Sequence, residues 1–124
     1  TVKINYRYPV TKHYEECAPK LDAAFAGAGF TKVAETHKKA LYVDPQTPYI
    51  QTLLQVYGEM TDFKPGTLCI GGGTYAKAIP NIVAFGPIFP GDAVREHLPN
   101  EYWEIEKLVL NAHIYAEALY RLAR

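Results

Sequence analysis

The sequence predicts an α/β fold, because strand-like and helix-like segments alternate along its 124 residues. Residues 1–10 alternate strictly between apolar and polar side chains, which is typical of a strand that buries one face. The short apolar runs 67–70 and 82–86 are typical of fully buried strands. Three longer segments place apolar side chains at helical spacing: residues 14–28, 48–62 and 103–123.

The N-terminal strand is expected to bury one face and to show arginine on the other. Its apolar face carries Val2, Ile4, Tyr6, Tyr8 and Val10, and Arg7 lies on the polar face. An arginine in that place is most often a solvated side chain, so the residues alone do not assign it a role. With the helix at 14–28 and an extended stretch at 30–43, the strand completes a unit too small to form a stable core alone.

A boundary is predicted at Asp44-Pro45-Gln46-Thr47-Pro48, where two prolines interrupt the pattern. Thr47 and Pro48 suit the N-cap and first position of the next helix. We therefore expect one domain or layer over residues 1–45 and a second over residues 46–124.

A glycine-rich loop, Gly71-Gly72-Gly73-Thr74, follows the apolar run 67–70. Successive glycines let a ligand approach the backbone N–H groups, which favours an anion such as a carboxylate or phosphate. Thr74 is expected to add a hydroxyl or to cap a short helix at 75–78. A simple tight turn is the alternative, and a phosphate or nucleotide site is disfavoured because no lysine directly follows the glycines.

His97 is the candidate metal ligand, because it lies in a polar loop between a strand end and a helix start. Imidazole is the commonest metal-binding side chain, although a loop histidine is more often simply exposed. No other histidine of the chain stands at a spacing that would complete a metal site with it.

Composition limits the partners. Thirteen basic residues balance thirteen acidic ones, so neither a nucleic-acid nor a membrane-surface partner is indicated. No apolar run is long enough to span a membrane, and no signal peptide opens the sequence. Only two cysteines occur, far apart, which suggests reduced thiols and a cytoplasmic location.

Several blocks together resemble the C-terminal end of the M20 family of zinc metallopeptidases, within it the PepV-type bacterial dipeptidases (Xaa-His dipeptidase or carnosinase-like). The blocks, in order, are Asn5-Tyr6-Arg7-Tyr8-Pro9, Ala40-Leu41-Tyr42-Val43, Ile70 to Asn81, Val83-Ala84-Phe85-Gly86, Phe89-Pro90-Gly91, His97 with Pro99-Asn100-Glu101-Tyr102, and Ile114 to Tyr120. They extend over nearly the whole chain.

The resemblance implies that residues 1–45 are the second half of a ferredoxin-like lid domain and residues 46–124 the C-terminal part of the catalytic α/β domain. It makes His97 a zinc ligand and Arg7 a contact of the substrate's carboxylate, together with Gly72, Gly73 and Thr74. The family hydrolyses dipeptides with water activated by two zinc ions. Leu98 departs from the pattern, because a polar residue would be expected after the histidine.

The remaining zinc ligands and the catalytic glutamates of the family lie in upstream sequence, so no catalytic residue is expected in this chain. We therefore expect the missing N-terminal part of the same enzyme as a partner, and a chain that is inactive alone. The alternative is a stand-alone α/β anion-binding or interaction module without hydrolytic activity.

Overall fold

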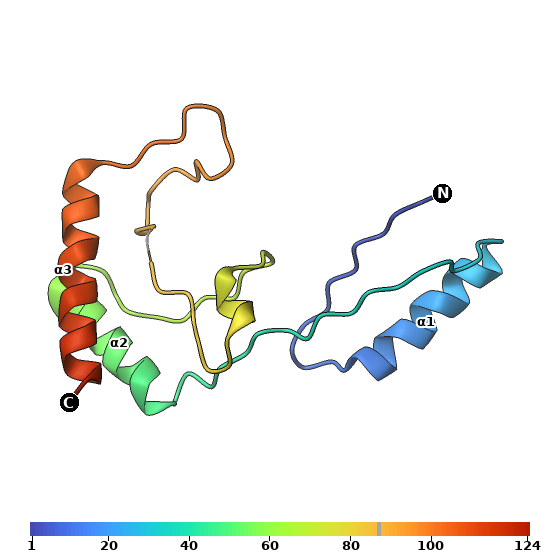
Figure 1. Ribbon diagram of the computed structural model, residues 1–124, viewed down its shortest axis with the longest axis horizontal. Helices are drawn as coiled ribbons and strands as arrows, with labels where there is room; N and C mark the ends of the chain where they lie inside the picture. Colours follow the sequence, from blue (N-terminus) through green and yellow to red (C-terminus); the bar gives the residue numbers. More distant parts are fainter. Residues whose placement is uncertain (87) are drawn as a thin grey trace. The chain divides into compact units, whose positions relative to one another are not determined.

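The computed structural model describes residues 1–86 and 88–124, which divide into two compact units. Unit 1 comprises Thr1–Tyr42 and unit 2 comprises Val43–Arg124. Unit 1 contains helix α1 (Tyr14–Gly27), and unit 2 contains α2 (Pro48–Met60), the short 3-10 helix η1 (Tyr75–Ala78) and α3 (Ile105–Leu122) (Figure 1). The three predicted long helices are thus confirmed, with ends that differ by up to two residues.

The predicted strands do not form in the part of the chain that the structure describes, where no residue has a paired β-ladder. Irregular connections are found instead before α1, at residues 1–9, and after it, at residues 30–43 (Figure 1). A strand is stabilised by hydrogen bonds to a neighbour, and none of these segments has one here. The α/β class, which rests on a sheet, remains a prediction.

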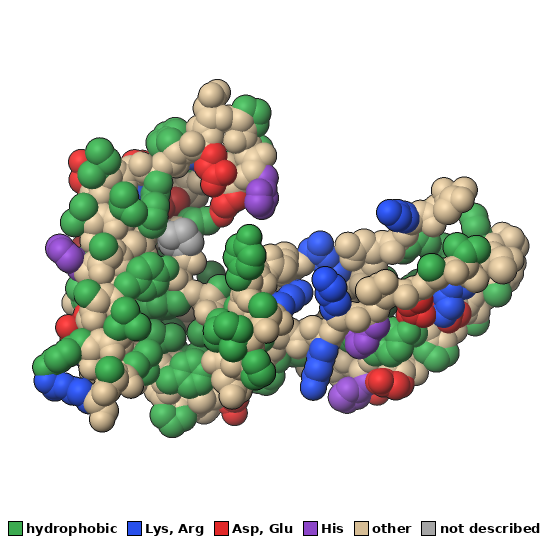
Figure 2. Space-filling view, viewed as in Figure 1, with side chains coloured by type: hydrophobic (Ala, Val, Ile, Leu, Met, Phe, Trp, Pro, Cys, Tyr) green, Lys and Arg blue, Asp and Glu red, His purple; other side chains and the backbone are tan. Residues whose placement is uncertain are grey.

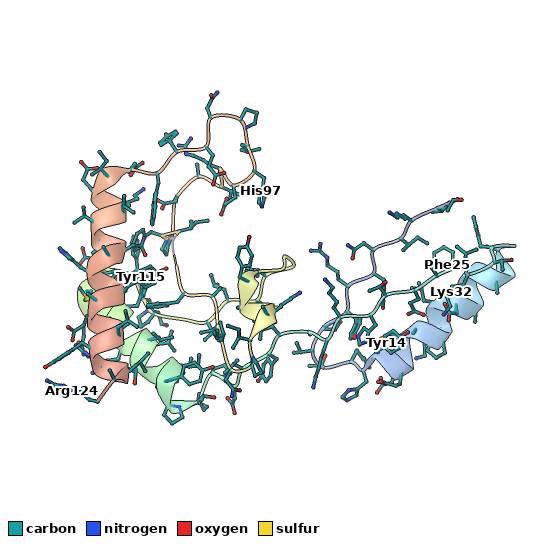
Figure 3. All side chains as sticks on the ribbon, in the orientation of Figure 1. Tyr14, Phe25, Lys32, His97, Tyr115 and Arg124 are labelled. Atoms are coloured by element: carbon teal, nitrogen blue, oxygen red, sulfur yellow. The ribbon has the colours of Figure 1, made fainter. Side chains whose placement is uncertain are left out.

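Unit 1 is held together by contacts between α1 and the two segments that flank it. Tyr14 of α1 stacks on His37 with 4.0 Å between ring centroids and donates a hydrogen bond to Glu35. Tyr8 of the first segment pairs its hydroxyl with His37 Nε2 at 2.6 Å. Lys32 forms ion pairs with Asp22 of α1 and with Glu35; Figure 3 labels Tyr14 and Lys32. A polar and aromatic network thus replaces an apolar core.

The expected burial of the first segment is not observed. Val2, Ile4, Tyr6 and Val10 are each at least 44% exposed, and α1 buries none of its residues. One helix and two connections offer too little surface to cover these side chains, in keeping with the size of the unit. Pro19 does not end α1, although it removes one backbone donor from the helix.

Unit 2 has a small apolar core between α2 and α3. Val56 of α2 and Ile114 of α3 are almost completely buried, and Phe89 joins them from the connection that precedes α3. Phe89 also stacks with Tyr57, with 6.3 Å between ring centroids. The buried cluster is Ile50, Leu53, Val56, Phe89, Ile114 and Ala118.

The buried stripe of α3 differs from the one that its periodicity predicts. The apolar residues at helical spacing in 103–123 include Ile105 and Leu119, which are 72% and 69% exposed, whereas Asn111, Ile114 and Ala118 form the buried line. Among the described elements α3 packs only against α2, so a narrow line suffices for that contact. Apolar side chains consequently cover much of the face visible in Figure 2.

Gly86 is needed where the chain passes close to α3. Its φ is +76°, and an added Cβ would lie 3.0 Å from both Asn111 Oδ1 and the Tyr115 hydroxyl. Tyr115 donates a hydrogen bond to the carbonyl oxygen of Phe85. Both the backbone conformation and the lack of space therefore require glycine at this position.

Candidate functional site

The glycine loop leads directly into η1. Thr74 has extended backbone angles, and its Oγ1 accepts a hydrogen bond from the amide of Ala76 at 3.2 Å. Its carbonyl oxygen accepts from the amide of Lys77 at 3.1 Å. The predicted cap is therefore confirmed. Because a hydroxyl that accepts still carries its own proton, Thr74 can also donate to a ligand.

The loop is open on the side of its glycines. An added Cβ on Gly72 would meet nothing within 4 Å, and one on Gly73 would meet only the side chain of Lys77. Within the described chain, the amides of Gly72 and Gly73 donate to no other residue. Two N–H groups and one hydroxyl proton are thus available to an anion at this loop.

Lys77 is a residue that the sequence pattern failed to single out. Its Nζ lies 3.6 Å from the position that a Cβ of Gly73 would occupy. Lys77 is the third residue of η1, and its amide closes the first turn on the Thr74 carbonyl oxygen, so its side chain begins one turn after the loop. That spacing of one turn is the signal that could have found Lys77, had residues 75–78 been expected to form a 3-10 helix.

His97 lies in the loop that joins the Phe89–Asp92 turn to α3 (Figure 3). Its side chain is exposed and its φ is 64°, a left-handed conformation that is uncommon outside glycine. Its amide donates to Glu101 Oε2 at 3.3 Å. Among the described residues no hydrogen bond or ion pair joins the His97 imidazole to Gly72, Gly73 or Thr74.

Lys107 holds both ends of the His97 loop. Its Nζ lies 2.5 Å from Asp92 Oδ1 before the loop and 2.8 Å from Glu104 Oε2 after it. The hydrogen bond from Lys107, with a second from the Phe89 amide, holds the pKa of the Asp92 carboxyl below its usual range. Hydrogen bonds to Asp92 and Glu104 raise the pKa of Lys107. The loop that displays His97 is therefore tied to the first turn of α3.

The described residues alone do not fit a zinc site. Glu96, which precedes His97, could offer a second metal ligand, because its Oε2 is buried and has no hydrogen-bond partner among the described residues. Zinc sites use three or four protein ligands, and no group of three histidine, cysteine or acidic side chains gathers anywhere in the described chain. A site that uses His97 would need ligands from elsewhere.

Arg7 lies in unit 1, whereas the other predicted site residues lie in unit 2. It is exposed, and it stands between Tyr6 and Tyr8, whose rings stack with 6.1 Å between centroids. Tyr6 and Tyr8 contact Cys17 of α1 and His37 respectively. These contacts fix the residues on either side of Arg7.

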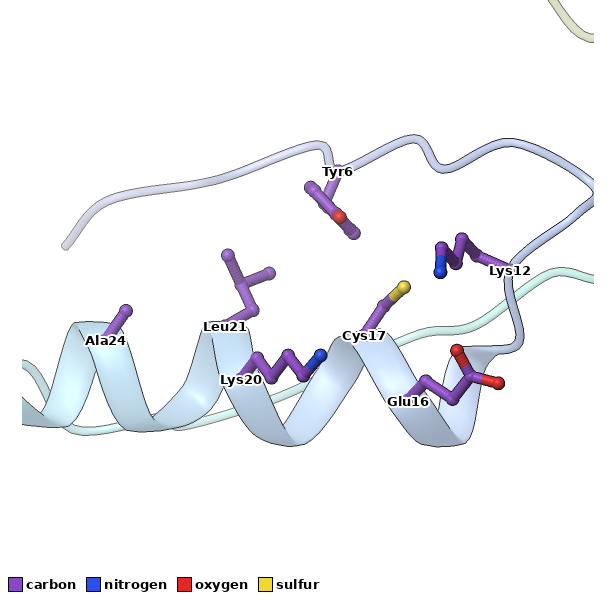
Figure 4. Close-up of a pocket in the computed structure, with 7 residues that line it drawn as sticks. All are labelled: Tyr6, Lys12, Glu16, Cys17, Lys20, Leu21 and Ala24. Atoms are coloured by element: carbon purple, nitrogen blue, oxygen red, sulfur yellow. The ribbon is translucent and has the colours of Figure 1, made fainter.

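A cavity of about 380 Å³ lies in unit 1 between the first segment and α1 (Figure 4). Interaction with the Cys17 thiol is the main cause that raises the pKa of the Tyr6 hydroxyl beside it. The lining mixes Lys12 and Lys20 with Glu16 and contains none of the predicted site residues. No chemistry is assigned to it. The lining residues are Tyr6, Lys12, Glu16, Cys17, Lys20, Leu21 and Ala24.

The chain is similar over nearly its whole length to bacterial proteins named as dipeptidases. It is 36% identical over 121 residues to "Putative dipeptidase YtjP" of Bacillus subtilis, which is 98% of this chain and 26% of that protein. It is 34% identical over 119 residues to a "Putative dipeptidase" of Staphylococcus epidermidis, 96% of this chain and 25% of that protein. No family model and no solved structure matches the chain.

The chain spans about a quarter of the length of these relatives. In the described part of the chain, no helix is both long and apolar enough to cross a membrane. The similarity thus relates the chain to proteins named as dipeptidases.

Proposed function

We propose that this chain is the C-terminal portion of a zinc-dependent dipeptidase of the M20 family, PepV-type. The observation that carries the proposal is similarity to proteins named as dipeptidases along 98% of the chain, combined with an open glycine loop. A dipeptide ends in a carboxylate, and a loop with two available amides and a hydroxyl proton suits that group. The reduced thiols make the cytoplasm its expected location.

In this proposal Gly72, Gly73 and Thr74 bind the carboxylate at the C-terminal end of the dipeptide. The two amides and the Thr74 hydroxyl donate hydrogen bonds to its oxygens. Arg7 binds the same carboxylate from the lid domain, since a guanidinium can donate two parallel hydrogen bonds to it. These contacts orient the peptide bond and restrict the length of the substrate to dipeptides.

His97 would provide one ligand to the two zinc ions of the complete enzyme, and the other ligands would come from upstream sequence. When bound, zinc supplies the activated water and polarises the scissile carbonyl. The exposed imidazole of His97, displayed on a loop held by Lys107, supports this assignment. The described residues hold no complete metal site, so the 124-residue chain alone is expected to be inactive.

The test uses the full-length dipeptidase with His97→Ala. We expect dipeptide hydrolysis to fall at least about a thousandfold, and the zinc bound per chain, measured by atomic emission, to decrease. His113→Ala is the matched control, because His113 is an exposed histidine of α3, and it should keep both properties. Full zinc occupancy and activity in His97→Ala would show that the ligand assignment is wrong.

A stand-alone anion-binding module is the second candidate, favoured by the same open loop. It predicts that the 124-residue chain binds carboxylates by itself, and that no longer protein containing this chain hydrolyses dipeptides. The activity of the full-length protein therefore separates the two candidates.

A further inference from the structure

We propose that Lys77 is a further substrate-binding residue, which supplies the positive charge of the carboxylate site at the glycine loop. This inference rests on the proposed function and adds to it a residue to which neither the sequence pattern nor the resemblance gives a role. Its basis is the position of the Lys77 ammonium beside Gly73.

The local fold places that ammonium at the loop. Thr74 starts η1 by accepting the Ala76 amide, and the Lys77 amide closes the turn on the Thr74 carbonyl at 3.1 Å. Ala76 between them is buried, with 6% of its surface exposed, and anchors the short helix in unit 2. Lys77 is exposed, and its Nζ lies 3.6 Å from where a Gly73 side chain would begin.

Because Gly72 and Gly73 carry no side chains, a ligand can approach both the loop amides and the Lys77 ammonium. A Cβ at Gly73 would occupy the space next to the ammonium, whereas glycine leaves it open to a ligand. Lys77 has three donors and forms no ion pair with the described residues, in contrast to Lys107 and Lys32, which both form ion pairs. A carboxylate bound to the loop amides would thus meet an ammonium within hydrogen-bonding reach.

The charges favour a carboxylate over a phosphate. The loop offers one ammonium, two amides and one hydroxyl proton, which matches a group with one negative charge and two oxygens. An inorganic phosphate carries up to two charges and needs more donors than this loop supplies. We therefore assign the site to a peptide carboxylate.

The experiment measures carboxylate binding to the 124-residue chain by amide NMR. N-acetylglycine is titrated while the Gly72 and Gly73 amides are observed, and N-acetylglycinamide and inorganic phosphate serve as comparison ligands. In Lys77→Met we expect the dissociation constant for N-acetylglycine to rise about tenfold, the size of one charge-assisted hydrogen bond. Lys77→Arg should stay within about threefold of the original chain, and N-acetylglycinamide should bind weakly to all variants.

Lys64→Met is the matched control, since it removes an exposed lysine of unit 2 next to Pro65, which lies against Gly58 of α2. It should leave binding unchanged, and unaltered spectra outside the loop will show that each variant is folded. Equal carboxylate affinity of Lys77→Met and the original chain would overturn the inference, as would tighter binding of phosphate than of N-acetylglycine.

A parallel measurement on the full-length protein keeps this inference separate from the proposed function. There, Lys77→Met should raise KM for dipeptides about tenfold with little change in kcat. Active enzyme with an unchanged KM would refute the role of Lys77 alone, whereas a full-length protein without dipeptidase activity would refute the proposed function.

Discussion

At the scale of single residues, backbone conformation distinguishes His97 from the other histidines. Among the described residues, three that are not glycine have a positive φ near 60°, and the two besides His97 are asparagines, Asn81 and Asn100. Asparagine tolerates the left-handed region, whereas other residues there cost about 1–2 kcal/mol. Such a conformation persists only where the surroundings impose it. The hydrogen bond from His97 to Glu101 and the ion pairs of Lys107 are the contacts that do so here.

Two substitutions at His97 test this conformation. His97→Gly should be more stable than His97→Ala by about 1 kcal/mol, because glycine adopts a positive φ without steric cost and alanine does not. Urea unfolding of the 124-residue chain gives the difference. At Gly27, the last residue of α1, where φ is not positive, the order should reverse, and the alanine variant should be the more stable one. Equal stability of the two His97 variants would contradict a left-handed His97.

At the scale of elements, Lys107 of α3 joins two segments that the sequence separates. The side chains of Lys107 and Asp92 are 30% and 18% exposed, so this pair is better shielded from solvent than the other ion pairs of the chain that are described. Asp92 also accepts the Phe89 amide at 3.1 Å and thereby closes the turn that places Phe89 in the core. The aspartate therefore links the core, the His97 loop and α3.

This link predicts acid sensitivity. The pKa of Asp92 is lowered in the folded chain, so its contribution to stability is present above the ordinary aspartate pKa of about 3.9 and is lost as pH falls through the lowered value. Asp92→Asn should lower the free energy of unfolding at pH 7 and reduce the loss of stability between pH 5 and pH 2. Urea unfolding at several pH values measures both effects.

Asp62→Asn is the control for this series, because Asp62 is exposed. It should leave the acid-dependent loss as large as in the original chain. If Asp92→Asn had the same pH dependence as the original chain, Asp92 would not be the group responsible.

Periodicity in the sequence was sufficient to predict the helices, because helical hydrogen bonds are local. It was less successful with burial, since α3 turns Ile114 and Ala118 to α2 and leaves Leu119 exposed. That choice depends on which neighbours are present. The site shows the same division: the Thr74 cap could be predicted from its own segment, whereas the reach of Lys107 to Asp92 crosses 15 residues and required the fold.

At the scale of the whole molecule, the chain buries little of its apolar surface. Its core comprises a few side chains around α2 and α3, while Leu68, Ile105 and Leu119 are 92%, 72% and 69% exposed. Exposed apolar surface of this extent usually marks contact with another polypeptide. Under the proposed function, this polypeptide is the upstream part of the same dipeptidase, because the relatives are about four times as long as this chain.

The last prediction concerns the exposed apolar side chains of α3, among them Leu119. When the upstream part of the dipeptidase is co-expressed with the 124-residue chain, we expect the two to copurify and to recover dipeptide hydrolysis. Leu119→Lys should prevent this recovery, because the charge would be buried against the upstream part at a cost of several kcal/mol. The same variant should change the stability of the isolated chain by less than about 0.5 kcal/mol, since Leu119 is exposed there. His113→Lys adds the same charge to an exposed polar position of α3 and should permit recovery. Copurification and activity of Leu119→Lys equal to those of the original chain would show that this face of α3 stays exposed in the complete protein.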